Sequence, residues 1–168
     1  MSVQPVISGC WVGRAHSSLI HWGAGPAHVA RHNAGLAYFA SPVTLRFGGQ
    51  GEADWYVLER LLREAALDCD ALAQAGVTAV SPAVMALEMI RARGLGWDAS
   101  IRGARGVLDR TYWLRWCAPM LRAASCVVVS DRAGWQASDG IAAEVEQARF
   151  WNRQVFFMAD GLGDGGAA

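Results

Sequence analysis

The sequence contains no lysine, no surplus of charge of either sign and no long apolar run. Its 15 basic residues are all arginine, and 15 acidic residues balance them. A neutral chain without a basic tail argues against an extended nucleic-acid surface. No stretch approaches the roughly 18 apolar residues that a membrane span needs, and the N-terminus does not have the form of a signal peptide. We therefore expect a cytoplasmic protein that neither enters a membrane nor binds long nucleic acids.

The four cysteines do not show the spacing that paired metal ligands have. Three of them lie in apolar contexts, where a free cysteine behaves as a small hydrophobic residue. Reduced thiols fit the cytoplasm, and we expect neither a bound metal nor a cofactor. The four are Cys10, Cys69, Cys117 and Cys126.

Residues 1–35 are rich in glycine, alanine, serine and proline and show no sustained hydrophobic period. All four histidines of the chain lie here, and His28 and His32 would share one face of a helix, a spacing that can hold a metal. No carboxylate or cysteine is near enough in sequence to complete such a site. We therefore favour a loosely attached, poorly ordered arm, with Trp11 and Trp22 available to dock it on the body or on a neighbouring subunit.

The length predicts a single domain with a full hydrophobic core, because 168 residues are within the usual size of one domain. We place the body of this domain at residues 36–158. Residues 159–168 are glycine-rich and are expected to form a flexible tail.

The body begins with a strand, a long helix and a second strand. Residues 36–40 form a short apolar run that Pro42 ends, since proline cannot continue a central ladder. An apolar stripe predicts a helix over residues 52–75, which Gly76 terminates, and residues 77–80 form the next strand. The short connections imply a right-handed crossover and parallel pairing.

The segment between residues 82 and 125 is less regular. Residues 83–93 fit either a short helix or a structured loop, and residues 94–105 read as a loop. From residue 107 to residue 124 the pattern is helical, although Pro119 must kink this helix or mark a new start. The apolar face of the helix carries Trp113, Trp116 and Leu121.

Two further strands, at residues 126–129 and 154–158, flank a helix that starts near Ser138. The first is an apolar, β-branched run of the kind found in a parallel strand covered on both faces. Ser138 and Asp139 suit the N-cap of the helix, and Gly140 would let a ligand approach its first turn.

Glu144 falls within the apolar stripe of this last helix. It follows Ile141 by three residues, whereas Glu146 points to another face. A carboxylate near the carboxyl end of a parallel strand is costly to bury unless it has a partner or a task, and that edge of an open sheet binds ligands. The alternative is a glutamate at the rim of the stripe that bends out to solvent. Because Asp131 and Ser138 lie nearby, we favour a functional site.

Several motifs along the body share a defined order and spacing. They are Tyr38-Phe-Ala-Ser41-Pro42, then Ala-Gly-x-x-x-x-Ser-Pro at the second strand, and then Asp131-x-x-Gly-Trp135-x-x-Ser138-x-Gly140-x-x-x-Glu144. Together they resemble the nucleoside 2-deoxyribosyltransferase superfamily, most closely a bacterial and phage branch with a Gly-Trp-x-x-Ser signature. The resemblance covers about Leu36 to Met158. The resemblance and the order of strands and helices along the chain both indicate an α/β, flavodoxin-like three-layer sandwich. Its parallel sheet would have four to five strands in the order 2-1-3-4.

The resemblance implies a role for each matching residue. Glu144 would be the nucleophile at the anomeric carbon of the sugar, Ser138 would bind a 5′-phosphate, and Tyr38 would contact the sugar or the nucleophile. The implied activity is that of a nucleoside or nucleotide N-glycosidase or 2-deoxyribosyltransferase, because a carboxylate beneath the sugar stabilises an oxocarbenium-like transition state and then bonds to it. Further substrate contacts would come from Ser41, Pro42, Trp135 and Gly140.

The chain departs from the superfamily at one position. The superfamily usually has a second acidic residue about where this chain has Trp116 or Cys117. Asp109 lies about 10 Å away along a helix, too far to replace it without a change of register. Asp131 could assist the leaving base or cap a loop, and the sequence does not separate these roles. A non-catalytic nucleotide-binding or sensing module is therefore the alternative function.

A homo-oligomer is also expected. The resemblance implies sites that a neighbouring subunit completes, and eight tryptophans are many for a small monomer. The expected partners are thus a small nucleoside or nucleotide and further copies of the chain.

Overall fold

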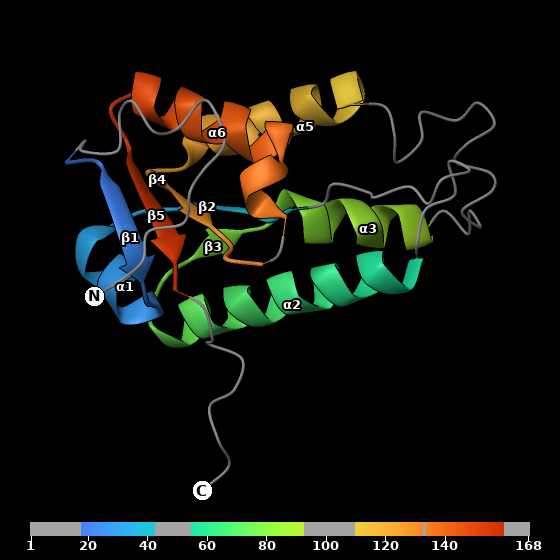
Figure 1. Ribbon diagram of the computed structural model, residues 1–168, viewed down its shortest axis with the longest axis horizontal. Helices are drawn as coiled ribbons and strands as arrows, with labels where there is room; N and C mark the ends of the chain where they lie inside the picture. The colour runs from blue at the N-terminus through green and yellow to red at the C-terminus, as the bar shows by residue number, and fades with distance from the viewer. Residues whose placement is uncertain (1–17, 43–54, 93–109, 133, 160–168) are drawn as a thin grey trace, which may run out of the picture.

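The computed structural model describes residues 18–42, 55–92, 110–132 and 134–159. Within them the chain forms a five-stranded sheet in the order β1-β5-β4-β2-β3, in which every neighbouring pair is parallel. Figure 1 shows this sheet between two groups of helices, which is the flavodoxin-like, three-layer fold predicted from the sequence. The strands are β1 (Ile20–Ala24), β2 (Ala37–Ala40), β3 (Ala79–Val80), β4 (Cys126–Val129) and β5 (Gln154–Met158).

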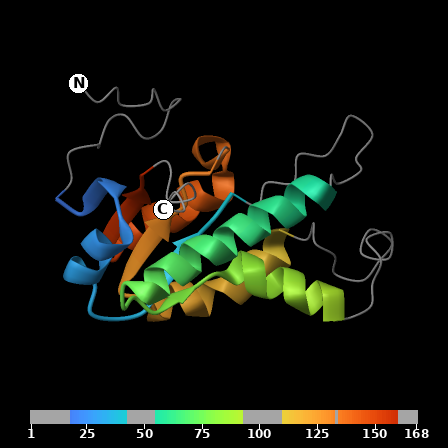
Figure 2. The same cartoon turned by 90° about the horizontal axis from the view of Figure 1, so that it is seen from below.

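Helices cover both faces of the sheet. One buried cluster joins α5 and α6 to the sheet, and a second joins α1 and α2 to the opposite face. Figure 2 shows α2 and α3 lying side by side. The helices are α1 (Pro26–His32), α2 (Trp55–Gln74), α3 (Pro82–Ala92), α5 (Arg110–Ala123) and α6 (Asp139–Phe150), with a short 3-10 helix at Trp135–Ala137 before α6.

The alternation of side chains along β2 supplies both clusters. Tyr38 and Ala40 pack on the α5–α6 side, whereas Ala37 and Phe39 pack on the α1–α2 side, because successive residues of a strand point to opposite faces. All residues of β2 and β4 are buried, as expected for central parallel strands. This alternation directs Tyr38 toward the helix that carries Glu144.

The four strands predicted from the sequence are present in the predicted order. Their order β3-β2-β4-β5 corresponds to 2-1-3-4 of the predicted strands, and the fifth strand extends the sheet beside β5. Gly76 follows α2 with φ +85°, a conformation that glycine adopts readily at a helix end. Of residues 83–93, left open between helix and loop, residues 83–92 belong to α3, and α5 continues through Pro119.

The predicted disorder of residues 1–35 is wrong for residues 18–35. Here β1 pairs in parallel with β5, and α1 follows it. Ala24 and Val29 are buried in the core. The sequence pattern concealed β1 because the strand is short and lies at the sheet edge, where four of its five residues stay partly or fully exposed.

Trp22 docks this N-terminal unit on the body. Its ring stacks on that of Phe157 of β5, with ring centroids 4.1 Å apart and planes 15° apart. Residues 1–17, the predicted loop at 94–105 and the tail beyond Ala159 lie outside the described residues.

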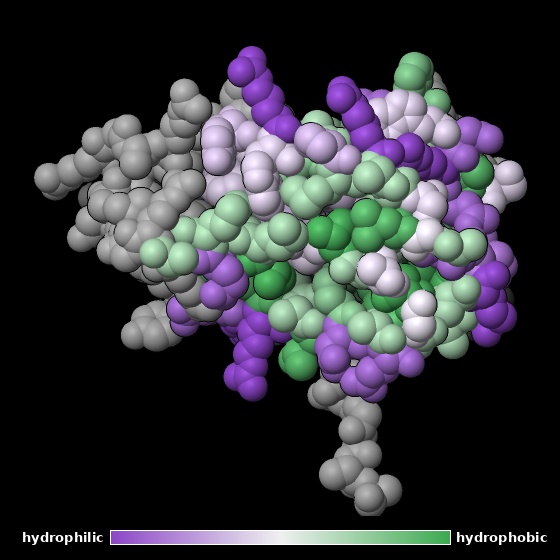
Figure 3. All heavy atoms as spheres, turned by 180° about the vertical axis from the view of Figure 1, so that it is seen from behind, coloured by the Kyte–Doolittle hydropathy of each residue, from purple (hydrophilic) through white to green (hydrophobic). Residues whose placement is uncertain are grey.

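The described surface carries several exposed apolar side chains. Figure 3 shows apolar residues reaching the surface across the middle of the face opposite to that of Figure 1. Such side chains suit contacts between subunits, and the expected homo-oligomer stays a prediction. Among helices in the described ranges, none has the length and apolar character of a membrane-crossing segment. The exposed large apolar residues are Trp22, Leu67, Met85, Leu114 and Phe150.

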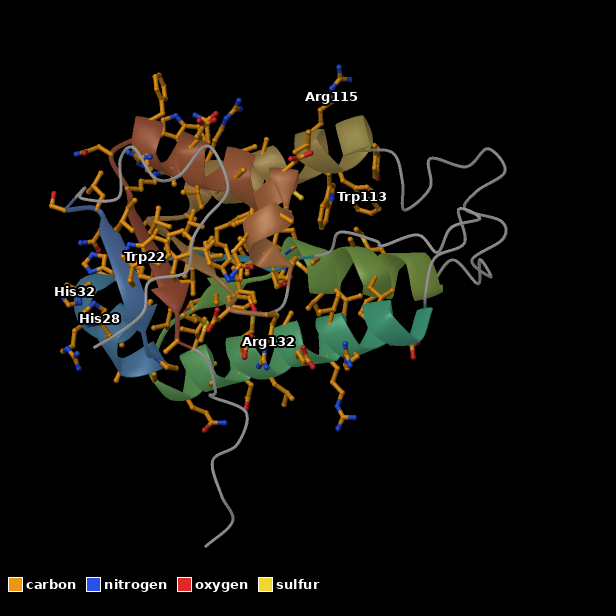
Figure 4. The ribbon with its side chains drawn as sticks, viewed as in Figure 1. Trp22, His28, His32, Trp113, Arg115 and Arg132 are labelled. Atoms are coloured by element: carbon orange, nitrogen blue, oxygen red, sulfur yellow. The ribbon has the colours of Figure 1, made fainter. Side chains whose placement is uncertain are left out.

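Three histidines meet where β1 and α1 cover the end of the sheet. Nε2 of His28 lies 3.2 Å from Nδ1 of His21, and the ring of His32 stacks on that of His28 with centroids 4.4 Å apart (Figure 4). His21 also stacks on Phe156 of β5, with centroids 4.5 Å apart. In the described ranges, no three or more potential ligands are grouped so that they could hold a metal. The cluster therefore rests on ring contacts, the hydrogen bond between His28 and His21, and a second hydrogen bond of 2.9 Å between Nδ1 of His32 and the backbone oxygen of His28.

This arrangement requires that at least one of the two bonded rings is neutral. A hydrogen bond between two histidines needs one ring nitrogen as acceptor, and a protonated ring offers none. Burial, and then the charges of His28 and His32, lower the pKa of His21 from 6.5. Burial, and then the charges of His32 and Arg31, lower the pKa of His28. Because both pKa values are lower in the folded chain, the unfolded chain takes up protons first as the pH falls through about 6.5, and folding stability decreases.

We predict that His21→Phe makes the free energy of unfolding less sensitive to acid, so that between about pH 7.5 and pH 5.5 the difference between variant and wild type shifts in favour of the variant. Phenylalanine retains a ring against Phe156 but cannot be protonated. Urea unfolding at a series of pH values measures the slope. Trp22→Phe, on the same strand, is the matched control and should keep the wild-type slope. Equal slopes in the two variants would contradict the prediction.

Candidate functional site

The carboxylate of Glu144 meets the hydroxyl of Tyr38 beneath α6. Tyr38 lies on β2, and Glu144 lies in the second turn of α6. The Tyr38 hydroxyl donates a hydrogen bond of 2.5 Å to Oε1 of Glu144, at the short end of the range for such bonds. Tyr38 is 1% exposed, whereas Glu144 as a whole residue is partly exposed. The carboxylate thus turns inward, as its place in the apolar stripe predicts.

The docking of α6 fixes this orientation. Ile141, Val145 and Ala148 of α6 are buried against the sheet. Glu144 lies three residues after Ile141 and four before Ala148, so it shares their face. Glu146 lies on the opposite side of the helix and is exposed. The two glutamates therefore have different environments although only one residue separates them.

Burial makes Glu144 a weak acid. It raises the pKa of Glu144 from 4.5 to about 7, and the hydrogen bond from Tyr38 acts in the lowering direction. A shift of this size corresponds to at most about 3 kcal/mol in favour of the neutral carboxyl, and to less where water reaches the residue. Burial and the charge of Glu144 also raise the pKa of Tyr38, so the tyrosine keeps its proton and remains a donor. Near neutral pH both forms of Glu144 are populated.

Cys117 of α5 is the third member of this group. It packs against the cluster that contains Tyr38. Burial raises the pKa of the Cys117 thiol to about 11, while a hydrogen bond with Tyr38 lowers it and the charge of Glu144 raises it. The thiol is therefore neutral near pH 7. The resemblance implies a second acid at position 116 or 117. At position 117 this chain has a thiol, which lies beside Tyr38 and Glu144. At position 116 it has Trp116, whose ring makes an edge contact with Trp113.

Ser138 caps α6. Its Oγ accepts a hydrogen bond of 3.4 Å from the backbone N–H of Ile141. This bond uses an acceptor position of the hydroxyl and not its proton, so the phosphate contact predicted for Ser138 stays a prediction beside a structural role. At Gly140 an added Cβ would make an ordinary contact of 3.7 Å with Ser138 Oγ. The described residues thus leave room for a side chain at position 140.

Trp135 belongs to the core, and its predicted role as a substrate contact stays a prediction. It is 3% exposed and packs against Phe157, with ring centroids 5.0 Å apart. Gly134 before it has φ +99°, a conformation that other residues rarely adopt. The Gly-Trp-x-x-Ser signature therefore combines a turn, a core anchor and the Ser138 helix cap.

The remaining predicted residues lie in two loops: Asp131 follows β4, and Ser41 and Pro42 follow β2. Asp131 accepts a hydrogen bond of 3.3 Å from Nε1 of Trp135, which favours the loop-cap role over the leaving-base role. Pro42 is buried after β2. Next to it, Oγ of Ser41 is buried and has no hydrogen-bond partner in the described part of the chain. A buried hydroxyl without a partner is uncommon, so Ser41 retains hydrogen-bonding capacity at the carboxyl end of β2.

A second inward carboxylate was missed by the sequence predictions. Asp68 of α2 is 5% exposed and is held by Arg132, with Nη2–Oδ1 2.6 Å and Nε–Oδ2 3.2 Å. The hydroxyl of Ser130 donates a third hydrogen bond of 3.2 Å to Oδ2. Figure 4 shows Arg132 lying over α2. These contacts tie the loop after β4, which leads to α6, to the opposite helical layer.

The sequence did contain a signal for Asp68. It lies three residues after Ala65 and four before Leu72, both buried in the apolar stripe of α2. This is the same spacing that distinguishes Glu144 on α6. Applying the rule to every helix would have found both inward carboxylates, though not their different partners.

We predict that Arg132→Ala lowers the free energy of unfolding by about 2 kcal/mol or more, because it leaves a buried carboxylate with a single side-chain donor. Asp68→Ala should cost less, since the Arg132 side chain is already 26% exposed and can turn to water. Equilibrium urea unfolding measures both changes.

The matched control for this pair is Arg60→Ala. Arg60 pairs with Glu64 at 3.8 Å, but its side chain is 69% exposed, so its removal should cost less than about 0.5 kcal/mol. Equal losses for Arg132→Ala and Arg60→Ala would show that the buried pair contributes no more than a surface pair.

The family model described as "Domain of unknown function (DUF1937)" matches residues 35–160. The match begins after α1 and includes β2 to β5 with the helices between them, so Tyr38, Cys117 and Glu144 all lie within it. The chain therefore belongs to this family. A comparison with curated proteins found no match.

Proposed function

We propose that this member of the DUF1937 family is an N-glycosidase or 2-deoxyribosyltransferase that cleaves the base–sugar bond of a nucleoside or nucleotide, with Glu144 as nucleophile. The observation that carries the proposal is the hydrogen bond of 2.5 Å from the Tyr38 hydroxyl to Glu144 Oε1. The order of the motifs, which resembles that of the nucleoside 2-deoxyribosyltransferase superfamily, gives independent support.

The chemistry needs one well-placed carboxylate. Cleavage of an N-glycosidic bond passes through an oxocarbenium-like transition state, whose positive charge a carboxylate below the sugar stabilises before it bonds to the anomeric carbon. A bond from Tyr38 to Oε1 holds the carboxyl group of Glu144 in one orientation and leaves Oε2 for attack. Water, or a second base, would then release the sugar from Glu144. Because the Tyr38 side of the carboxyl group is buried, the charge interaction is stronger there than in solution.

The start of α6 supports a nucleotide as substrate. Helix N-termini offer free backbone N–H groups and a positive dipole end, which together favour phosphate. Ser138 lies at this end with a hydroxyl proton that its cap bond leaves unused. Ser138 and Glu144 are six residues apart on the same helix, about 9 Å along its axis. A 5′-phosphate at the helix start would thus place the sugar near the second turn.

A second candidate function is a non-catalytic nucleotide-binding or sensing module. The observation that favours it is the neutral thiol of Cys117 beside Tyr38 and Glu144, because a neutral thiol with a pKa of about 11 protonates a leaving base poorly. Thermal stabilisation by deoxynucleotides without release of free base would select this candidate. Release of base at a rate that depends on Glu144 would exclude it.

We predict that Glu144→Gln and Glu144→Ala each reduce base release from deoxynucleosides and their 5′-monophosphates by at least about 10³-fold, because the nucleophile is lost. Chromatography of released base over a panel of substrates measures the effect. Glu146→Gln is the matched control, since Glu146 is exposed on the other side of the same helix, and it should retain activity. Unchanged turnover in the Glu144 variants would refute the nucleophile assignment.

The pH dependence provides a separate prediction. Only the ionised carboxylate attacks the sugar, so kcat/KM should rise with pH and level off above the Glu144 pKa of about 7. Tyr38→Phe removes the hydrogen bond that lowers this pKa, and the rising limb should move to higher pH. A pH profile of kcat/KM for the wild type and the variant tests this shift. A limb that stays in place, or moves to lower pH, would rule out Tyr38 as the residue that stabilises the carboxylate.

A further inference from the structure

Aromatic side chains gather at the N-terminal part of α5. The ring of Trp113 makes an edge contact with Tyr112, at a centroid distance of 4.9 Å, and another with Trp116 at 5.5 Å. Both contacts have rings nearly perpendicular, at 79° and 88°. Trp113 is only partly buried, unlike Trp135 in the core. The group therefore holds the indole of Trp113 in place, and the residue as a whole stays partly exposed.

The position of Trp113 on α5 relates it to the Tyr38–Glu144 pair. Cys117, which contacts that pair, follows Trp113 by four residues, so the two side chains lie on the same face of the helix. Four residues correspond to about 6 Å along the helix axis. Figure 4 shows Trp113 projecting from α5 toward α3, whereas Arg115 points away from the body. A planar group attached to a sugar above Glu144 and directed along α5 would thus reach the indole.

We propose that Trp113 is the platform on which the base of the substrate stacks. This inference rests on the function proposed above and specifies the leaving group as a planar aromatic heterocycle, held by its π-face. Stacking on an indole is favourable for every nucleobase, so Trp113 supplies binding energy without selecting a single base. It also holds the base in place while the bond to the sugar breaks. This suits a site in which the neutral thiol of Cys117, and not an acid, lies beside Glu144.

The test separates base binding from sugar and phosphate binding. Dissociation constants are measured by calorimetry in a Glu144→Ala background, so that no substrate is consumed, for deoxynucleoside 5′-monophosphates and for 2-deoxyribose 5-phosphate. Trp113→Ala should weaken nucleotide binding about tenfold and leave binding of the sugar phosphate unchanged. Trp113→Phe, which keeps a stacking face, should stay within about threefold of the parent protein. Leu114→Ala is the matched control, since Leu114 is an exposed apolar residue on the same turn.

The outcomes distinguish this inference from the proposed function. If the wild type releases base and Trp113→Ala matches Leu114→Ala, the platform assignment is wrong and the glycosidase stands. Equal weakening of nucleotide and sugar phosphate by Trp113→Ala would also overturn the platform, because it indicates a general disturbance of the fold. If the wild type neither binds nor cleaves any deoxynucleotide, the proposed function fails, and the platform fails with it.

Discussion

The hydrogen bond between Tyr38 and Glu144 is the constraint on which the arrangement of this domain depends. It joins residues 106 positions apart, and it exists only if β2 directs Tyr38 to the α6 side and α6 docks through Ile141 and Val145. A carboxylate in such a position is costly unless it is neutral or hydrogen-bonded. The structure uses both means, because Tyr38 donates a hydrogen bond and burial raises the pKa of Glu144 to about 7. A group kept near its titration midpoint at neutral pH is typical of catalytic sites.

The comparison between Glu144 and Asp68 shows what an inward carboxylate does with different partners. Both lie within an apolar helical stripe at the same spacing. Asp68 meets the planar fork of Arg132 and the hydroxyl of Ser130, so its charge is neutralised and its oxygens are satisfied. Glu144 meets a tyrosine hydroxyl and a thiol, neither of which carries a compensating charge. The first environment stabilises a charged carboxylate, whereas the second leaves the carboxyl group of Glu144 able to gain or lose a proton near pH 7.

The sequence predicted most of this fold, because long amphipathic helices and buried strands have strong periodic signals. It located the inward Glu144 for the same reason. It did not predict β1, whose five residues at the sheet edge are too few and too exposed to show a period. It also did not reveal that Trp135 is buried in the core, because a motif gives the order of residues but not which rings the core will bury. The partner of Asp68 was equally hidden, since Arg132 lies 64 positions away and only the packed layers bring the two together.

The neutral thiol of Cys117 has a consequence for the carboxylate beside it. Two acids that share a buried site compete for one negative charge, and the pKa of one of them rises strongly. An acid at position 117 would therefore raise the pKa of Glu144 above its present value or take the charge itself. With the thiol, whose pKa of about 11 keeps it protonated, Glu144 is the residue in this group of three that ionises near pH 7. For the proposed enzyme, the chain would thus lack an acid for the leaving base but keep Glu144 ionisable as the nucleophile, and substrates whose bases leave readily or are held in place by stacking would be favoured.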